Sequence, residues 1–417
     1  MPPAIRTLLG LFGRLAASAP LWIPAAPLHA QDTAVAVTRA QAVASALGRG
    51  ARLGVARADT AVAFANVLSA RALQNPTLSA IYSKSTPQYH LIMDLPLDYP
   101  WLRRTRIGAA AAARTAAQYR YRFERAAIEL DADTTYTRTL AARAHAQLSR
   151  RNAEAADSLR RMAISRRDAG DASDLDVALA TVNAGQAMNA AAVDSLAYLS
   201  AVLDLQTIMG LQTGAVALTP SDSLGAPPAD SAGLVLASAV PLPVAAARAS
   251  LESARLAAAV QHRSVWLAPS FTAGVEGGDP TGSEPGILPT IGVALPIPFL
   301  SRNRGPILLA EAERTRAEAE LTLAQVESQA AIARAQRQRA IALARVERDR
   351  TLVTAADRVA SMSLTAYREG ASAIANVLEA QRNAREVLGQ YVDDLADAWN
   401  ATALLRVITL TPAASAP

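Results

Sequence analysis

Leu95-Pro96-Leu97 is repeated in this chain as Leu295-Pro296-Ile297, 200 positions further on. The same offset joins further matching residues: Arg104 and Arg304, Ile107 and Ile307, Gly170 and Gly370, Val177 and Val377, and Ala180 and Ala380. An offset that stays constant over such a long stretch indicates that a whole structural unit was duplicated. The sequence therefore predicts two copies of one unit, residues 31–220 and residues 221–417.

The first 30 residues have the features of a secretory signal peptide. Arg6 and Arg14 precede or interrupt an apolar run, and the small residue Ala30 precedes Gln31. Beyond this segment, the most apolar stretch, 234–247, contains two prolines and is too short to be a membrane-spanning helix. We therefore expect an exported chain that begins near residue 31, and any membrane crossing must be made by strands.

Composition excludes several classes of function. The formal net charge of +5 includes the two arginines of the signal segment, and the other arginines alternate with acidic residues, so nucleic-acid binding is not expected. There is no cysteine, and His90, His145 and His262 lie far apart, so we expect neither a metal site nor a cofactor. No Ser-His-Asp set, phosphate-binding loop or paired-carboxylate motif is evident, and we expect no enzyme.

Most of the chain is predicted to be helical because it is rich in Ala, Leu, Arg, Glu and Gln. The predicted helices are 35–74, 103–168, 172–210, 244–263, 303–368 and 372–410. The helices 103–168 and 303–368 would each be about 100 Å long, and the return helices 172–210 and 372–410 only about 57 Å. In each copy one long helix would therefore pack, as an antiparallel coiled coil, against two shorter helices stacked end to end.

Four segments alternate between apolar and polar residues and predict strands: a pair within 77–97, then 270–277 and 288–298. In the clearest of them, Tyr89, Leu91 and Met93 alternate with His90 and Asp94. This pattern fits transmembrane barrel strands with a wet lumen, and it also fits half-buried strands of a soluble sheet. In the barrel interpretation His90, Asp94 and Glu276 face the lumen, and Lys84 lies at its rim.

Aromatic residues at the junctions between strand and helix favour the membrane interpretation: Tyr99, Trp101, Trp266 and Phe299. Four strands cannot close a membrane barrel, so several chains must combine their strands. Two copies would give eight strands with a filled interior, and three copies would give twelve strands with an open lumen.

The order of these elements resembles that of the TolC-type outer-membrane efflux proteins over essentially the whole chain after residue 30. The stretch 292–299, followed by Arg302-Asn303-Arg304-Gly305, is similar to the strand end in the family's second repeat. The stretch 367–370, leading to 377–381, is similar to its helical-tip motif. The resemblance implies a mainly α fold with a small β part, in which tandem-duplicated coiled coils form an α-barrel and four strands per chain contribute to a trimeric twelve-stranded β-barrel.

The resemblance also implies a function. A homotrimer would lie in outer-membrane lipid, with its helical tunnel in the periplasm, and would dock a periplasmic adaptor and an inner-membrane pump of the RND type or similar. Heavy-metal ions or small drugs would be the substrates. Two alternatives remain from the sequence alone: a periplasmic adaptor protein and a soluble structural coiled-coil protein.

The resemblance assigns residues to the end of the tunnel. Residues expected at the adaptor-contacting tips are Gly170, Asp171, Gly370 and Ala371. Residues expected at the pore constriction are Asp176, Tyr367, Asn376 and Glu379. In the family a tyrosine at the position of Tyr367 bonds an aspartate at the position of Asp176, and its arginine partner falls on Ser372 here.

Overall fold

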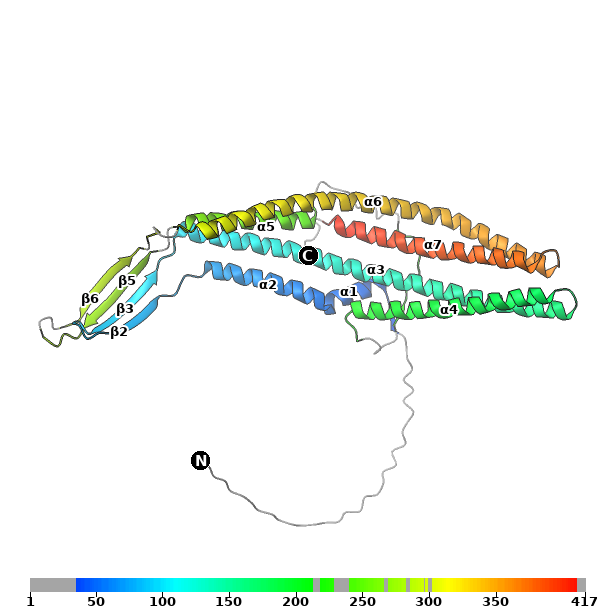
Figure 1. The fold of residues 1–417 in the computed structure, drawn as a ribbon, viewed down its shortest axis with the longest axis horizontal. Coiled ribbons are helices and arrows are strands. Elements are labelled where there is room, and N and C mark those ends of the chain that lie inside the picture. The colour runs from blue at the N-terminus through cyan, green and yellow to red at the C-terminus, as the bar shows by residue number, and fades with distance from the viewer. Residues whose placement is uncertain are drawn as a thin grey trace, which may run out of the picture.

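The computed structural model describes residues 35–212, 218–228, 240–265, 269–282, 286–295, 297–298 and 302–410. The expected signal peptide, Trp266 and Phe299 lie outside the described residues. Helices dominate the described chain, and one small sheet extends beyond their end (Figure 1).

Both halves of the chain follow one order of elements: short helix, β-hairpin, long helix and return helix. The first half contains β1 (Val35–Val37), α1 (Arg39–Arg49), α2 (Ala51–Arg71), β2 (Thr77–Tyr82), β3 (Tyr89–Pro96), α3 (Pro100–Asp168), α4 (Asp174–Ile208) and β4 (Leu218–Pro220). The second contains α5 (Leu242–Arg263), β5 (Ser270–Gly277), β6 (Leu288–Ala294), α6 (Arg304–Arg368) and α7 (Ile374–Ile408). The two long helices have 69 and 65 residues.

The first predicted helix is corrected by the structure. Residues 35–74 do not form one helix, because β1 precedes α1 and Gly50 is extended between α1 and α2, with φ −63° and ψ 124°. Thr38 begins α1 with a capping box that it makes with Gln41. The long helix α3 also begins earlier than expected, because Pro100 occupies its first turn, where a missing N–H costs nothing.

The helices pack in a consistent order across the molecule. Near the sheet α3 contacts α2 and α5, and α5 in turn contacts α6. Toward the far end α3 contacts α4 and α7, and α7 contacts α6 (Figure 1). The outermost helices are therefore α2 and α4 on one side and α6 on the other. Within the described residues, no helix is both long and apolar enough to cross a membrane.

A buried cluster in the middle of the molecule ties the start of the chain to the helices. Tyr136 of α3 is fully buried, and its hydroxyl donates a hydrogen bond of 2.8 Å to the carbonyl oxygen of Val37 in β1. β1 also pairs in parallel with β4, so the two strands lie together against α3. The Arg39 guanidinium lies 5.3 Å from the Tyr136 ring centroid and 4.2 Å from that of Trp399 in α7. These contacts join the two halves of the chain.

Candidate functional site

The two β-hairpins, one from each half, form a single antiparallel sheet in the order β2-β3-β5-β6. The junction is the β3–β5 pair, which aligns Asp94 with Thr272 and His90 with Glu276. β2 and β6 are the edges, and each pairs on one side only among the described residues. Unpaired N–H and C=O groups along such an edge favour pairing with another strand.

One face of the sheet carries the polar residues that the alternation predicted. Thr272 Oγ1 donates a hydrogen bond of 2.6 Å to Asp94 Oδ1, and His90 Nδ1 lies 3.5 Å from Glu276 Oε1. These contacts bring together side chains from the two halves of the chain. Lys84 lies exposed in the turn after β2. That this face lines a lumen remains a prediction.

The opposite face of the sheet is apolar and uncovered. Leu78 is 69% exposed, Val293 69% and Ile291 75%. Other exposed apolar residues on this face are Leu91, Met93, Leu95, Phe271 and Val275. No described helix packs extensively on the sheet, which projects away from the helical rods (Figure 1). An apolar face of this kind is costly in water and indicates contact with lipid or with another protein.

Aromatic pairs lie at both ends of the apolar face. Tyr99 and Trp101 stack at the helical end with ring centroids 4.7 Å apart, as the sequence analysis placed them. Tyr82 and Tyr89 lie at the opposite end with centroids 5.4 Å apart. This second pair was not predicted from the sequence, although both tyrosines fall on the apolar face at the ends of their strands. An apolar band between two aromatic girdles is typical of transmembrane strands.

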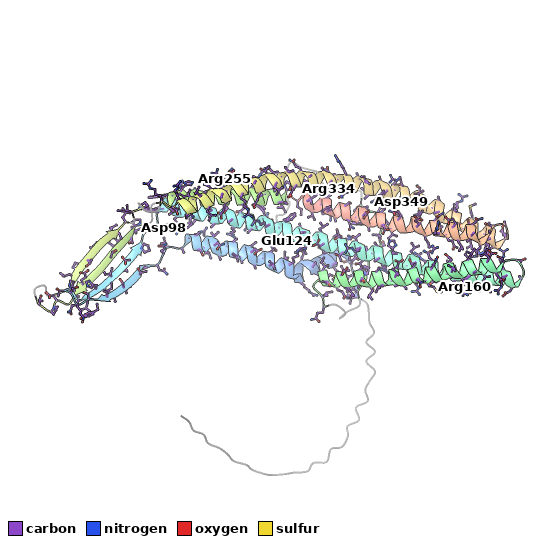
Figure 2. The ribbon with its side chains drawn as sticks, viewed as in Figure 1. Asp98, Glu124, Arg160, Arg255, Arg334 and Asp349 are labelled. Carbon is purple, nitrogen blue, oxygen red and sulfur yellow. The ribbon has the colours of Figure 1, made fainter. Side chains whose placement is uncertain are left out.

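Arginines of α3 fix the junction between sheet and helices. Arg106 Nη2 lies 2.6 Å from Asp98 Oδ2, and Arg103 donates a hydrogen bond of 2.8 Å to the carbonyl oxygen of Arg71 at the end of α2. Asp98 lies where the strands give way to the helices (Figure 2). These contacts could not be predicted from the sequence, because they join segments that only folding brings together.

The two helical tips end in the same backbone motif. The N–H groups of Gly170 and Asp171 bond the carbonyl oxygens of Arg167 and Arg166, each at 2.8 Å. Gly370 and Ala371 repeat these bonds in the second half. Both glycines have positive φ, 85° and 77°, which glycine adopts most readily. The tips are therefore equivalent in structure, and their contact with an adaptor remains a prediction.

We expect Gly370→Ala to lower the free energy of unfolding by about 1–2 kcal/mol, because alanine is strained in the left-handed region. Gly185 is the matched control, since it lies inside α4 and nothing lies within 4 Å of a Cβ added there. Gly185→Ala should raise the free energy of unfolding by about 0.5–1 kcal/mol. Denaturant unfolding of both variants measures this, and equal shifts of the same sign would contradict the strained-turn account.

Tyr367 is buried between the tips of the two halves. It is 2% exposed within a cluster that includes Leu159, Ile374 and Val377. The Arg166 guanidinium lies 4.7 Å from its ring centroid and donates a hydrogen bond to its carbonyl oxygen. Burial raises the pKa of the Tyr367 hydroxyl, the positive charge of Arg166 opposes this rise, and the negative charge of Asp176 adds to it.

The hydrogen bond between Tyr367 and Asp176 that the resemblance implies is not formed in this structure. Among the described residues the Tyr367 hydroxyl has no hydrogen-bond partner. The Asp176 carboxylate instead accepts a hydrogen bond of 3.2 Å from the backbone N–H of Ser173, as part of the capping box that begins α4. Local capping thus occupies the carboxylate.

The other expected constriction residues are also held by local contacts. Asn376 Nδ2 donates a hydrogen bond of 3.1 Å to Ser372 Oγ, and Glu379 pairs with Arg382 at 3.0 Å. Glu379 and Arg382 line a groove of ≈ 700 Å³ between α4 and α7. The paired arginine reduces the negative charge that Glu379 contributes, and the gating role of these residues remains a prediction.

The outermost helices carry exposed apolar stripes that the sequence analysis did not identify. Their exposed residues include Val55 and Val62 on α2, Leu175, Leu179, Val182, Val193 and Leu196 on α4, and Leu323, Val326, Ile341, Leu352, Val359 and Met362 on α6. Their spacing places each set on one side of its helix. Heptad spacing in the sequence could have revealed the stripes, but not which of them the fold leaves uncovered.

Comparison with solved structures identifies the fold. The outer membrane protein VceC from Vibrio cholerae matches with a TM-score of 0.75 at 17% sequence identity, over 89% of this chain and 96% of that chain. The CmeC outer membrane channel from Campylobacter jejuni matches with a TM-score of 0.71 at 15% identity, over 89% of this chain and 85% of that chain. The MtrE outer membrane channel from Neisseria gonorrhoeae, in its open state, matches with a TM-score of 0.69 at 16% identity, over 89% and 88%.

The sequence itself matches no protein-family model and no curated protein. At these identities the structural matches establish the fold, and they agree with the fold predicted from the resemblance. The chain therefore has the TolC-type fold of the outer-membrane channels: two coiled-coil repeats carrying one four-stranded sheet.

Proposed function

We propose that this chain is the subunit of an outer-membrane channel, the passive exit duct of a tripartite efflux system. The observation that carries the proposal is the four-stranded sheet, with one polar face, one uncovered apolar face and two open edges. Hydrocarbon does not tolerate unpaired backbone groups, so such a sheet can cross a membrane only when several copies close into a barrel. Its fold, shared with solved outer-membrane channels, supports this function and an outer-membrane location.

The exposed edges support a homotrimer. β2 and the apolar stripes of α2 and α4 lie on one side of the chain, and β6 and the stripe of α6 lie on the other. One copy can therefore present its α6 side to the α2 and α4 side of the next, which continues both the sheet and the helical wall. Three copies give twelve strands, and a barrel of that size has room for an open lumen, whereas eight strands are filled by their own side chains.

The channel performs no chemistry of its own, and its tips at Gly170 and Gly370 dock a periplasmic adaptor, which is bound in turn to an inner-membrane pump of the RND type or similar. Heavy-metal ions or small drugs are the proposed cargo. The two alternatives, an adaptor protein and a soluble coiled coil, give no reason for an uncovered apolar sheet with aromatic pairs at both ends.

Cysteine cross-linking between the two sheet edges tests the assembly, and the chain has no native cysteine to interfere. We expect Ser79→Cys in β2, combined in turn with Thr290→Cys, Gly292→Cys or Ala294→Cys in β6, to form disulfides between copies in isolated outer membranes. β2 and β6 are separated by two strands within a chain, about 14 Å, which is too far for a disulfide.

A closed trimer predicts bands at two and three times the mass of the chain and none above. Ser79→Cys alone is the control and should give neither band. A ladder that ends at the dimer, or recovery of the chain in the soluble fraction, would contradict the proposal.

A further inference from the structure

The two sides of the chain carry opposite charge in the half that lies away from the sheet. On one side α4 contains four aspartates and no lysine or arginine. On the other side residues 334–368 of α6 contain eight arginines and three acidic residues. Within one chain α3 and α7 lie between these two helices (Figure 1). Opposite charges on two sides of a chain favour contact between one copy and the next.

One row of residues on α4 is exposed along its length. Val182, Val193 and Asp204 follow one another at intervals of eleven residues, which is close to three helical turns, so they lie on one face. The two valines are 59% and 66% exposed, and Asp204 is exposed too. Ala180 and Ala184, which α4 buries, lie on the opposite face. Asp204 forms no ion pair with the described residues, so its charge is available to a neighbouring copy.

A similar row lies on α6. Arg337, Arg348 and Val359 are exposed and also follow one another at intervals of eleven residues. Neither arginine forms an ion pair with the described residues. Ile341 and Leu352 lie beside this row and are 59% and 52% exposed. The row on α6 therefore offers unpaired positive charge and uncovered apolar area, as the row on α4 offers unpaired negative charge and apolar area.

Contacts inside the chain determine the level of the α4 row along the helices. Thr139 Oγ1 of α3 donates a hydrogen bond of 3.1 Å to the carbonyl oxygen of Ala201 in α4. The two helices are antiparallel, so three residues further along α4, toward the sheet, Asp204 is level with Tyr136 of α3.

Two further contacts determine the level of the α6 row. His145 of α3 lies 2.8 Å from Asp393 of α7. These helices are also antiparallel, so nine residues toward the sheet Tyr136 of α3 is level with Thr402 of α7. The hydroxyl oxygen of Thr402 accepts a hydrogen bond of 3.2 Å from Arg339 Nε of α6. Arg339 is therefore at about the same level as Asp204.

The two rows match when one copy is rotated onto the next. A rotation about an axis parallel to the helices keeps every residue at its level, so residues at equal levels can meet between copies. Arg337 is two residues, about 3 Å, from Arg339 along α6, and is thus within one turn of the level of Asp204. Since α4 and α6 are antiparallel, the equal intervals align the rows throughout: Asp204 with Arg337, Val193 with Arg348, and Val182 with Val359.

We propose that Asp204 of α4 forms an ion pair with Arg337 of α6 in the next copy, and that Val182 packs against Val359 in the same seam. The inference rests on the proposed function, because it requires a ring of copies. It adds the contacts that hold the helical wall together beyond the sheet. The ion pair also fixes the register of the seam, because sliding one helix by a turn separates the two charges.

Cysteine cross-linking in isolated outer membranes tests the level of the seam. Val182→Cys combined with Val359→Cys should form disulfides between copies. Val182→Cys with Ile341→Cys is the matched control, because Ile341 lies on the same face of α6 and is similarly exposed. It is five turns, about 27 Å, from Val359, so this pair should not cross-link.

Charge reversal tests the ion pair in the purified full-length trimer. Asp204→Arg or Arg337→Asp alone should lower the temperature at which the trimer dissociates by about 5 °C or more, because each places like charges together at three interfaces. The two substitutions combined should recover most of this loss. Arg350→Asp is the control and should have little effect, since Arg350 is exposed and lies about 140° around α6 from Arg337.

The sheet-edge pair Ser79→Cys with Gly292→Cys, measured in the same membranes, separates this inference from the proposed function. If the sheet edges cross-link but Val182→Cys and Val359→Cys do not, the seam is wrong and the trimer stands. A charge-reversed double variant that dissociates as early as the single variants would likewise overturn the ion pair. If neither cysteine pair cross-links, the proposed assembly fails together with the seam.

Discussion

Arginine in place of Ile291 should abolish assembly of this protein in the outer membrane. Ile291 lies at the centre of β6 on the apolar face and is 75% exposed in the single chain. An arginine on the lipid face near the bilayer midplane costs about 2–4 kcal/mol, so three copies would lose about 6–12 kcal/mol per trimer. We expect less than about one part in a hundred of the assembled protein that the wild type gives.

Thr290→Arg is the matched control, because Thr290 is the neighbouring residue and lies on the polar face. It is aligned with Gly274 on β5, which carries no side chain. This variant should assemble at close to the wild-type level. The measurement is the amount of heat-resistant oligomer in the outer-membrane fraction, and equal assembly of both variants would show that the apolar face does not contact lipid.

Tyr136→Ala should destabilise the protein by about 3–5 kcal/mol, the usual cost of removing a large buried side chain. Tyr136 is fully buried, and it holds β1 through Val37 and lies under the guanidinium of Arg39. Its loss leaves a cavity at the point where both halves of the chain meet. Denaturant unfolding of the detergent-solubilised protein should show the change as a clearly lower midpoint.

Tyr136→Phe separates packing from hydrogen bonding. The carbonyl oxygen of Val37 also accepts a hydrogen bond of 3.0 Å from the backbone N–H of Ser221, so it keeps a partner when the tyrosine hydroxyl is removed. We expect this variant to lose only about 1 kcal/mol. If the Ala and Phe variants unfold alike, the ring does not make the packing contribution that we assign to it.

Local patterns in the sequence predicted the parts of the site that depend on one segment at a time. The alternation along β3 placed His90 and Asp94 on one face, and the offset of 200 residues paired Gly170 with Gly370. The structure agrees on both, because side-chain direction in a strand and positive φ in a turn are fixed by neighbouring residues. Gly50 shows where this reasoning failed, since the Ala-rich composition around it hid a break between two helices.

Contacts between distant segments could not be predicted from the sequence. Asp176 and Tyr367 are both present, but the Asp176 carboxylate bonds Ser173 in a capping box and the Tyr367 hydroxyl has no partner among the described residues. One sequence does not show whether the carboxylate bonds the local backbone or a distant tyrosine. The ion pair between Arg345 of α6 and Asp394 of α7 depends on the relative register of the two helices, which the helical repeat alone does not determine.

The sequence by itself determined that the protein consists of two similar units. It also determined that each unit contains long helices and an amphipathic β-hairpin with one apolar face. The duplication follows from matching residues at a constant offset of 200 positions, and the helices and the hairpin faces follow from residue periodicity within single segments. Only the tertiary structure decided that the hairpins join through β3 and β5, that their apolar face stays uncovered, and that α2, α4 and α6 form the outer sides. These features depend on which distant segments pack together, because burial is set by the completed fold and not by any one stretch of chain.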